Sequence, residues 1–185
     1  MVIVVGGDIG LSGSDQPVSA KGAYRHGARY DWADLTRHLG LLVNGDINFA
    51  NLETVVTDKN SLPPTPKKFR FRSHPVGVQH LVKLGFNAFS LANNHAIDYG
   101  HAGMRETLRN IASLKQHGLA LTAGLGMGDN AFAPAIMSVR GAQVALAAVG
   151  IGGVSPRNGR VGMAGFHSDG DFLASLHSRV VTAAV

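Results

Sequence analysis

The chain has 185 residues, of which 45% are hydrophobic and 16% charged, enough for one globular domain with a buried core. The absence of cysteine excludes disulfides, thiolate zinc sites and cysteine nucleophiles. The net charge of +5 suits a polyanionic partner, whether nucleic acid, phosphate ester or polycarboxylate, but it is also common on a purely solubilising surface.

The amino-terminal segment predicts a strand that ends in a carboxylate. The aliphatic run Val2–Val5 indicates a buried, central, parallel strand, which Gly6 and Gly7 end. This run is too short for a signal peptide and has no basic leader, and no long apolar stretch follows. We therefore expect a cytoplasmic protein without a transmembrane segment. Asp8 stands at the carboxyl end of the strand, where it either caps a turn or serves as a ligand.

A loop, a helix and a second strand are the next predicted elements. Residues 12–30 are polar and glycine-rich and predict a long loop, and the apolar spacing over residues 31–42 predicts a helix. Residues 47–52 predict a strand that leads directly into Glu53. A glutamate here is costly to bury unless a cation or hydrogen bonds compensate its charge, so Glu53 either faces solvent or is a ligand.

A basic segment follows a proline-rich loop at residues 58–66. Residues 67–72, KKFRFR, alternate in the manner of a strand, which places Phe69 and Phe71 on one face and Lys68, Arg70 and Arg72 on the other. The basic face either contacts a polyanion or belongs to a solvated edge strand that its charges protect.

The sequence SLANNHAIDYG, residues 90–100, follows a predicted helix from Pro75 and a predicted buried strand at residues 85–92. Asn94 offers a neutral oxygen to a cation, His95 can be a ligand or a general acid, and Asp98 can hold His95 in one tautomer. The alternative is a polar turn in which the same side chains only cap the following helix.

The rest of the chain continues the alternation of strands and helices. We predict a helix over residues 102–117, a strand over 119–124, a hairpin over 135–149 with its turn at Arg140 and Gly141, and a helix over 171–185. Because no linker interrupts this order, residues 1–185 are expected to form one α/β domain with a layered sheet.

Three polar motifs now stand in a fixed order at successive strand ends: Asp8 within GDIG, Asn51–Glu53 within FANLETVVTD, and Asn93–His95 within NNHAIDYG. In this order, and together with FRFRSHP, they resemble the bacterial capsule-synthesis protein CapA family, which is associated with poly-γ-glutamate and is similar to calcineurin-like metallophosphoesterases. The resembling segments cover most of residues 2–150.

The resemblance implies a four-layer α/β sandwich of the metallophosphoesterase type, with a metal centre at the carboxyl ends of the strands. Asp8, Glu53 and Asn94 would be ligands of one or two divalent ions, which the residue types suggest are manganese, iron, zinc or magnesium. His95 would be the general acid, and Asp98 would orient it. Because the later histidine motifs of the family are absent, the domain is expected to be incomplete at its carboxyl end.

The implied function is capsule or poly-γ-glutamate biosynthesis through a metal-dependent hydrolase that acts on an anionic polymer or a phosphoester. Predicted substrate contacts are Asn51, Asn93, Lys68, Arg70 and Arg72. The alternative is a non-catalytic subunit that binds polymer or serves as a scaffold in a capsule synthesis or export assembly. Under either hypothesis the expected partners are an anionic polymer or phosphoester and other capsule synthesis proteins, without nucleic acid, and family analogy suggests association with the cell envelope.

Overall fold

The computed structural model describes residues 1–151 and 160–166, in which a four-stranded parallel sheet forms the centre of the molecule. Its order is β1-β4-β7-β8, with bounds Ile3–Ile9, Ile47–Leu52, Ala88–Ser90 and Leu121–Ala123. The predicted α/β class is therefore confirmed. The helix predicted over residues 171–185 lies outside the described residues.

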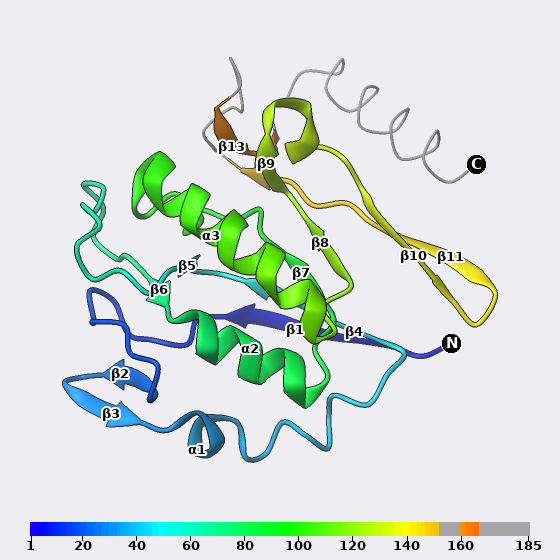
Figure 1. Ribbon diagram of the computed structural model, residues 1–185, viewed down its shortest axis with the longest axis horizontal. Coiled ribbons are helices and arrows are strands. Elements are labelled where there is room, and N and C mark those ends of the chain that lie inside the picture. The colour runs from blue at the N-terminus through cyan, green and yellow to red at the C-terminus, as the bar shows by residue number, and fades with distance from the viewer. Residues whose placement is uncertain (152–159, 167–185) are drawn as a thin grey trace.

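Helices α2 (Pro75–Leu84) and α3 (Gly100–Leu114) cover one face of this sheet, and α1 (Trp32–Thr36) lies beside α2 (Figure 1). The start and end of α2 follow from local chemistry. Proline occupies the first turn, where no N–H partner is needed, and Gly85 ends the helix with φ at 118°. Buried apolar residues of both helices join the main core, among them Leu81 and Met104. The helices predicted from Pro75 and over residues 102–117 are confirmed.

The opposite face of the sheet carries a second, smaller core. Strand β4 alternates its side chains, so that Ile47 and Phe49 face this second core while Ala50 and Leu52 face the helices. The predicted hairpin β10 (Ala135–Val139) and β11 (Ala142–Leu146) is confirmed, and its strands pack on the second core. Its turn residues have positive φ, 50° at Arg140 and 81° at Gly141, as a two-residue hairpin turn requires.

Short pieces complete the fold. These are the antiparallel pair β2 (Ala23–Arg25) and β3 (Ala28–Tyr30), the parallel pair β5 (Val55–Val56) and β6 (Arg72–Ser73), the antiparallel pair β9 (Leu125–Met127) and β13 (Val161–Met163), the parallel pair β12 (Gly150–Ile151) and β14 (Gly165–Phe166), and 3₁₀ helices at Lys115–His117 and Gly128–Ala131. Over the described ranges, no helix is both long and apolar enough to cross a membrane.

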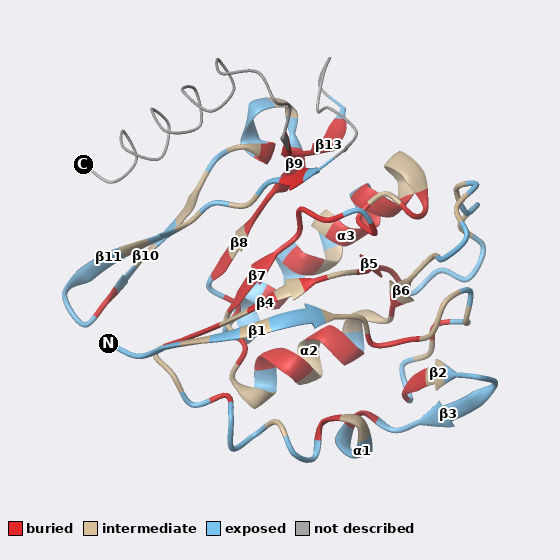
Figure 2. Ribbon diagram, turned by 180° about the vertical axis from the view of Figure 1, so that it is seen from behind, coloured by how far each residue is buried: buried red, intermediate tan, exposed pale blue. Residues whose placement is uncertain are grey.

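The prediction that the first strand is buried and central was wrong. β1 is the edge strand of the sheet, as its pale colour beside the buried β7 and β8 makes visible (Figure 2). Ile3 and Val5 are 49% and 71% exposed. An aliphatic run predicts a strand, but its place in the sheet depends on pairing with distant segments, which the run does not encode.

Four other predictions on local structure needed correction. Residues 12–30 contain the β2–β3 hairpin, and regular helix in residues 31–42 ends at Thr36. Only the end of the KKFRFR segment is a strand, because β6 starts at Arg72. The glycine-rich residues 124–129 predict a connection and residues 150–170 a loop, but β9 pairs with β13, and β12 pairs with β14. These short strands pair either with a segment far along the chain or, in β2 and β3, across a two-residue turn. Neither kind of pairing has a strong signal in the local sequence.

Candidate functional site

Polar side chains meet where the first three strands of the main sheet end. Asp8 of β1 pairs in register with Asn51 of β4, and Asn51 pairs with Ser90 of β7. A β-bulge precedes Asp8, because two residues lie between Val5 and Asp8 while one lies between their partners Phe49 and Asn51. Without this extra residue, Asp8 would point to the opposite face of the sheet from Asn51. The bulge at Gly6 and Gly7 thus places the Asp8 carboxylate on the same face of the sheet as Asn51.

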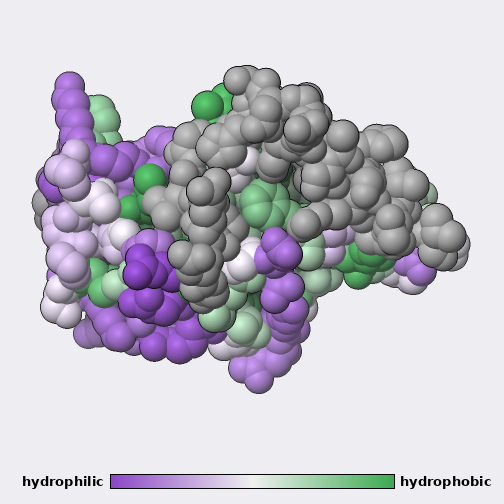
Figure 3. All heavy atoms as spheres, turned by 90° about the horizontal axis from the view of Figure 1, so that it is seen from above, coloured by the Kyte–Doolittle hydropathy of each residue, from purple (hydrophilic) through white to green (hydrophobic). Residues whose placement is uncertain are grey.

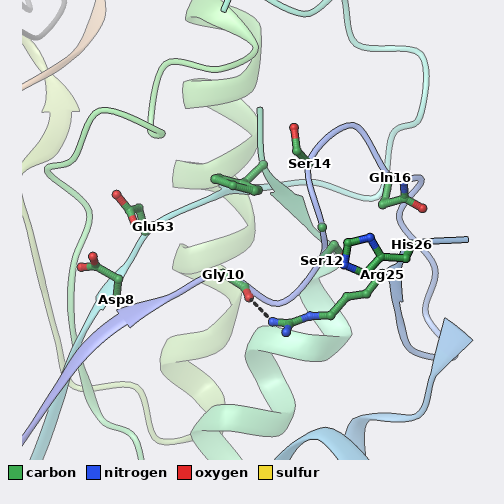
Figure 4. A pocket seen from close by; sticks show the side chains of 10 residues that line it. Asp8, Gly10, Ser12, Ser14, Gln16, Arg25, His26 and Glu53 are labelled. Atoms are coloured by element: carbon green, nitrogen blue, oxygen red, sulfur yellow. Dashed lines mark hydrogen bonds between the residues drawn. The ribbon is translucent and has the colours of Figure 1, made fainter. Parts of the chain in front are cut away.

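Two carboxylates lie side by side at this point. Glu53 directly follows β4, and its backbone N–H donates to the carbonyl of Ile9 at 2.9 Å, which anchors it beside the end of β1. Figure 4 shows the Glu53 and Asp8 side chains next to each other. Partial burial, and then the neighbouring Asp8 carboxylate, raises the pKa of Glu53. Asn51 supplies one compensating contact, since its Nδ2 donates to Asp8 Oδ1 at 2.7 Å.

The loop after β7 is fastened to these strand ends by Asn93. Its Nδ2 donates to Asn51 Oδ1 at 3.1 Å and to the Leu52 carbonyl at 3.0 Å, and its Oδ1 accepts from the His95 backbone N–H at 3.1 Å. The Asn93 side chain is thus occupied within the protein, while Asn94 is exposed. The substrate contacts predicted for Asn51 and Asn93 stay predictions, and both amides are used here in building the site.

His95 and Asp98 form a buried pair. The His95 Nδ1 lies 2.7 Å from Asp98 Oδ2, and the Asp98 side chain is completely buried. Because a carboxylate only accepts, Nδ1 carries the proton and Nε2 is the atom that can exchange one. Among the described residues Nε2 has no hydrogen-bond partner. The Phe71 ring packs on the imidazole at 4.4 Å between centroids and fixes its plane.

Lys67 also reaches this loop, and sequence reasoning missed it. Its ammonium forms an ion pair with Asp98 Oδ1 and donates to the Asn94 carbonyl at 2.7 Å. The Thr65 N–H and hydroxyl both donate to the Asp98 carbonyl, at 2.9 and 3.0 Å. The only sequence signal was the position of Lys67 at the end of a proline-rich loop, which does not distinguish it from Lys68.

The three basic residues predicted to contact substrate have different surroundings. Arg70 forms an ion pair with Asp15 at 2.7 Å, which lowers the pKa of Asp15. Arg72 donates to three backbone carbonyls and lies over the Tyr99 ring. Lys68 is exposed and lies over Phe69. The three side chains therefore do not form one open face, and their contact with substrate stays a prediction.

A pocket of about 450 Å³ opens beside the carboxylates. Asp8 and Glu53 lie on one side of it and Arg25 and His26 on the other, with Ser12 and Ser14 between them and Gln16 beside His26 (Figure 4). Hydrophilic side chains dominate the side of the molecule toward which the main strands run (Figure 3). The segment expected to be a plain loop over residues 12–30 thus builds one wall of this pocket.

The side chains present fit a hard divalent cation in type. Two adjacent carboxylates repel each other, and a cation between them would relieve the repulsion that raises the pKa of Glu53. Charged side chains that could bind such a cation are few, however. Within residues 1–151 and 160–166, no three His, Asp or Glu side chains come together closely enough to hold a metal. Any further ligands in this part of the chain must be neutral oxygens, such as that of Asn94, or water.

The main sheet of this α/β protein is parallel, and carboxylate, amide and imidazole side chains gather at the carboxyl ends of its strands. Comparison with known families makes this class specific. The model of the bacterial capsule synthesis protein family PGA_cap matches residues 2–174, and the chain belongs to this family.

Individual relatives are similar over shorter stretches. An uncharacterized protein of Sinorhizobium fredii is 38% identical over 73 residues, 37% of this chain and 16% of that protein. The PGA biosynthesis protein CapA of Bacillus subtilis is 33% identical over 79 residues, 43% of this chain and 20% of its own. A probable polyglutamine synthesis accessory protein of Mycobacterium tuberculosis is 33% identical over 86 residues, 45% and 22% respectively. The chain thus matches about a fifth of the length of these relatives.

Proposed function

We propose that this member of the capsule synthesis family is a metal-dependent hydrolase that acts on an anionic polymer, such as poly-γ-glutamate, or on a phosphoester. Two observations carry the proposal. The Asp8 and Glu53 carboxylates lie side by side at the ends of neighbouring strands (Figure 4). Hydrogen bonds through Asn51 and Asn93 link Asp8 to the loop that holds the buried His95–Asp98 pair. The names of two relatives support the polymer, because they refer to PGA biosynthesis and to polyglutamine synthesis.

Asp8, Glu53 and Asn94 would hold one or two divalent ions, with manganese, iron, zinc and magnesium all compatible with oxygen ligands. When bound, such a cation would stabilise negative charge on the group under attack. His95 would deliver a proton from Nε2 to the leaving atom, since Asp98 holds Nδ1 in its protonated state. Phe71, packed on the imidazole, would limit the access of water from that side.

We also propose that the fold is part of a four-layer sandwich of the metallophosphoesterase type. Support comes from the β10–β11 hairpin, which adds β structure to the face of the main sheet opposite α2 and α3. That face retains exposed apolar residues, Ile3 and Val5, as expected of a sheet that packs against another sheet.

The test is metal content. We would express the protein with manganese, iron or zinc and measure bound metal per chain by mass spectrometry for the wild type, Glu53→Gln and a surface control, Asp34→Asn. The proposal expects near-stoichiometric metal in the wild type and the control, and loss of metal in Glu53→Gln. A folded wild type that takes up none of these metals would contradict it.

Activity would then be measured on an aryl phosphodiester and on a γ-linked glutamate oligomer, with His95→Gln as the variant that retains metal. A loss of about 10² to 10⁴-fold in turnover with unchanged metal content is expected if His95 acts as the general acid. Equal turnover in both proteins would remove His95 from the reaction.

A second candidate function is a non-catalytic subunit that binds polymer and works with other capsule synthesis proteins. Two observations favour this candidate. No three His, Asp or Glu side chains cluster in the described part of the chain, and the name of the mycobacterial relative contains the word accessory. Under this hypothesis, Lys68→Ala combined with Arg70→Ala would weaken polymer binding and leave metal content unchanged. Hydrolysis that depends on Glu53 would exclude it.

A further inference from the structure

The pocket has a second polar side that the proposed chemistry does not use. The β2–β3 hairpin forms this wall, with Arg25 at the end of β2 and His26 in the turn. Both side chains lie across the pocket from Asp8 and Glu53 (Figure 4). The pocket is therefore lined with acidic groups on one side and a guanidinium and an imidazole on the other.

Arg25 differs from the other arginines near the site in its partners. Arg70 is paired with Asp15 and Arg29 with Asp31, and Arg72 donates to three backbone carbonyls. Arg25 has no ion pair with any described residue and fewer hydrogen bonds than Arg72. Its one hydrogen bond runs from Nη2 to the Gly10 carbonyl at 3.3 Å, which directs the side chain along the pocket wall. A guanidinium has five N–H donors, so several stay available for an oxyanion.

His26 is held in an uncommon backbone conformation. It occupies the first position of a two-residue turn with φ at 50°, and Gly27 follows at 79°. A residue without a β-carbon, or an asparagine, would adopt this conformation more readily than histidine. Arg140 has the same conformation in the β10–β11 turn, so the conformation itself belongs to the turn, and its effect at His26 is to place an exposed imidazole on the pocket wall beside Arg25.

We propose that Arg25 and His26 form an oxyanion subsite, which binds a carboxylate or phosphate group of the substrate across the pocket from Asp8 and Glu53. The inference rests on the proposed function for the acidic end of the pocket. A substrate with a repeating anionic group fits the arrangement, because one part of it can react near His95 while a neighbouring charged group contacts Arg25. Arg25 and His26 are then specificity residues for an anionic substrate.

The test compares two variants that remove the same charge. Arg25→Gln removes the guanidinium in the pocket, and Arg37→Gln removes an exposed one beyond α1. Affinities of the wild type and both variants for a short γ-linked glutamate oligomer and for inorganic phosphate would be measured by calorimetry in manganese buffer, with metal content determined on the same samples. Arg25→Gln should bind about tenfold more weakly than Arg37→Gln, because a charge-assisted contact is lost.

His26→Asn is the companion variant, since asparagine preserves the turn. It should weaken binding in the same direction, with the fold unchanged. An effect on the oligomer alone indicates a carboxylate ligand, and an effect on phosphate as well indicates any oxyanion, including a phosphoester. Equal affinities of Arg25→Gln and Arg37→Gln would overturn the subsite whatever the metal content, whereas a metal-free wild type would overturn only the proposed hydrolase.

Discussion

Asp98 is the residue on which the candidate site most depends, and Asp98→Asn tests this directly. Its side chain is fully buried and accepts three hydrogen bonds. Oδ2 accepts from the Phe71 N–H at 2.6 Å and from His95 Nδ1 at 2.7 Å, and Oδ1 accepts from the Lys67 ammonium. An asparagine has nearly the same shape but turns one of these two acceptors into a donor.

Either orientation of the new amide loses contacts. An NH₂ group in place of Oδ1 faces the Lys67 ammonium, and one in place of Oδ2 faces the Phe71 N–H. Losing a charged hydrogen bond costs about 1.5–3 kcal/mol, and leaving a buried donor unsatisfied costs about 1–3 kcal/mol more. Because the Lys67 side chain is 29% exposed and partly screened by solvent, we expect a loss near the lower end, about 3 kcal/mol.

The assay is equilibrium unfolding in urea, followed by the fluorescence of Trp32. This is the single tryptophan of the chain, and it is 8% exposed. Asp34→Asn, an exposed change on α1, is the control and should alter the free energy of unfolding by less than about 0.5 kcal/mol. A loss below about 1 kcal/mol in Asp98→Asn would refute the claim that this carboxylate holds the loops together.

Three further predictions concern stability. Burial lowers the pKa of His80 below its ordinary value of 6.5, so the unfolded chain binds the proton more readily than the folded one. The free energy of unfolding should therefore decrease as the pH falls below 6.5. Unfolding in urea at several pH values should show a smaller decrease in His80→Gln. A β-carbon at Gly77 would lie 2.6 Å from the Trp32 ring, so Gly77→Ala should cost about 1–3 kcal/mol and lower Tm, despite the better helix propensity of alanine. Asn48 is buried and donates to the Gly85 carbonyl at 2.9 Å, so Asn48→Ala should cost about 2 kcal/mol in the same urea assay, and an unchanged midpoint would contradict this.

Local signals in the sequence determined much of the fold. The helix α2 between Pro75 and Gly85 and the hairpin turn at Arg140 and Gly141 are defined by residues with restricted backbone preferences, and both were predicted. The position of β1 at the sheet edge and the pairing of β5 with β6 depend on contacts between segments far apart in the chain. The residue pattern within each of these strands does not predict which distant strand it pairs with.

Part of the candidate site was also predictable from local sequence signals. Asp8, Glu53 and His95 each follow an apolar segment recognisable as a strand, and the carboxyl ends of parallel strands converge. Lys67 and Arg25 come from irregular segments that lie near the site only through tertiary packing. Their residue type is common on protein surfaces, so the sequence offered no reason to select them.

The polar side chains of the loop after β7 fall into two groups, one buried within the protein and one left accessible, and the ligand site there stays a prediction. Asn93 and Asp98 are buried and use their side chains to fasten the loop to β4 and to the Lys67 segment. Their hydrogen bonds leave Asn94 exposed and leave the Nε2 of His95 without a partner among the described residues. Asp98 serves the fold through its contacts with the Phe71 N–H and the Lys67 ammonium, which compensate the cost of burying its charge, and the same carboxylate orients the His95 imidazole. The proposed role of His95 as a general acid requires this fixed orientation of its imidazole.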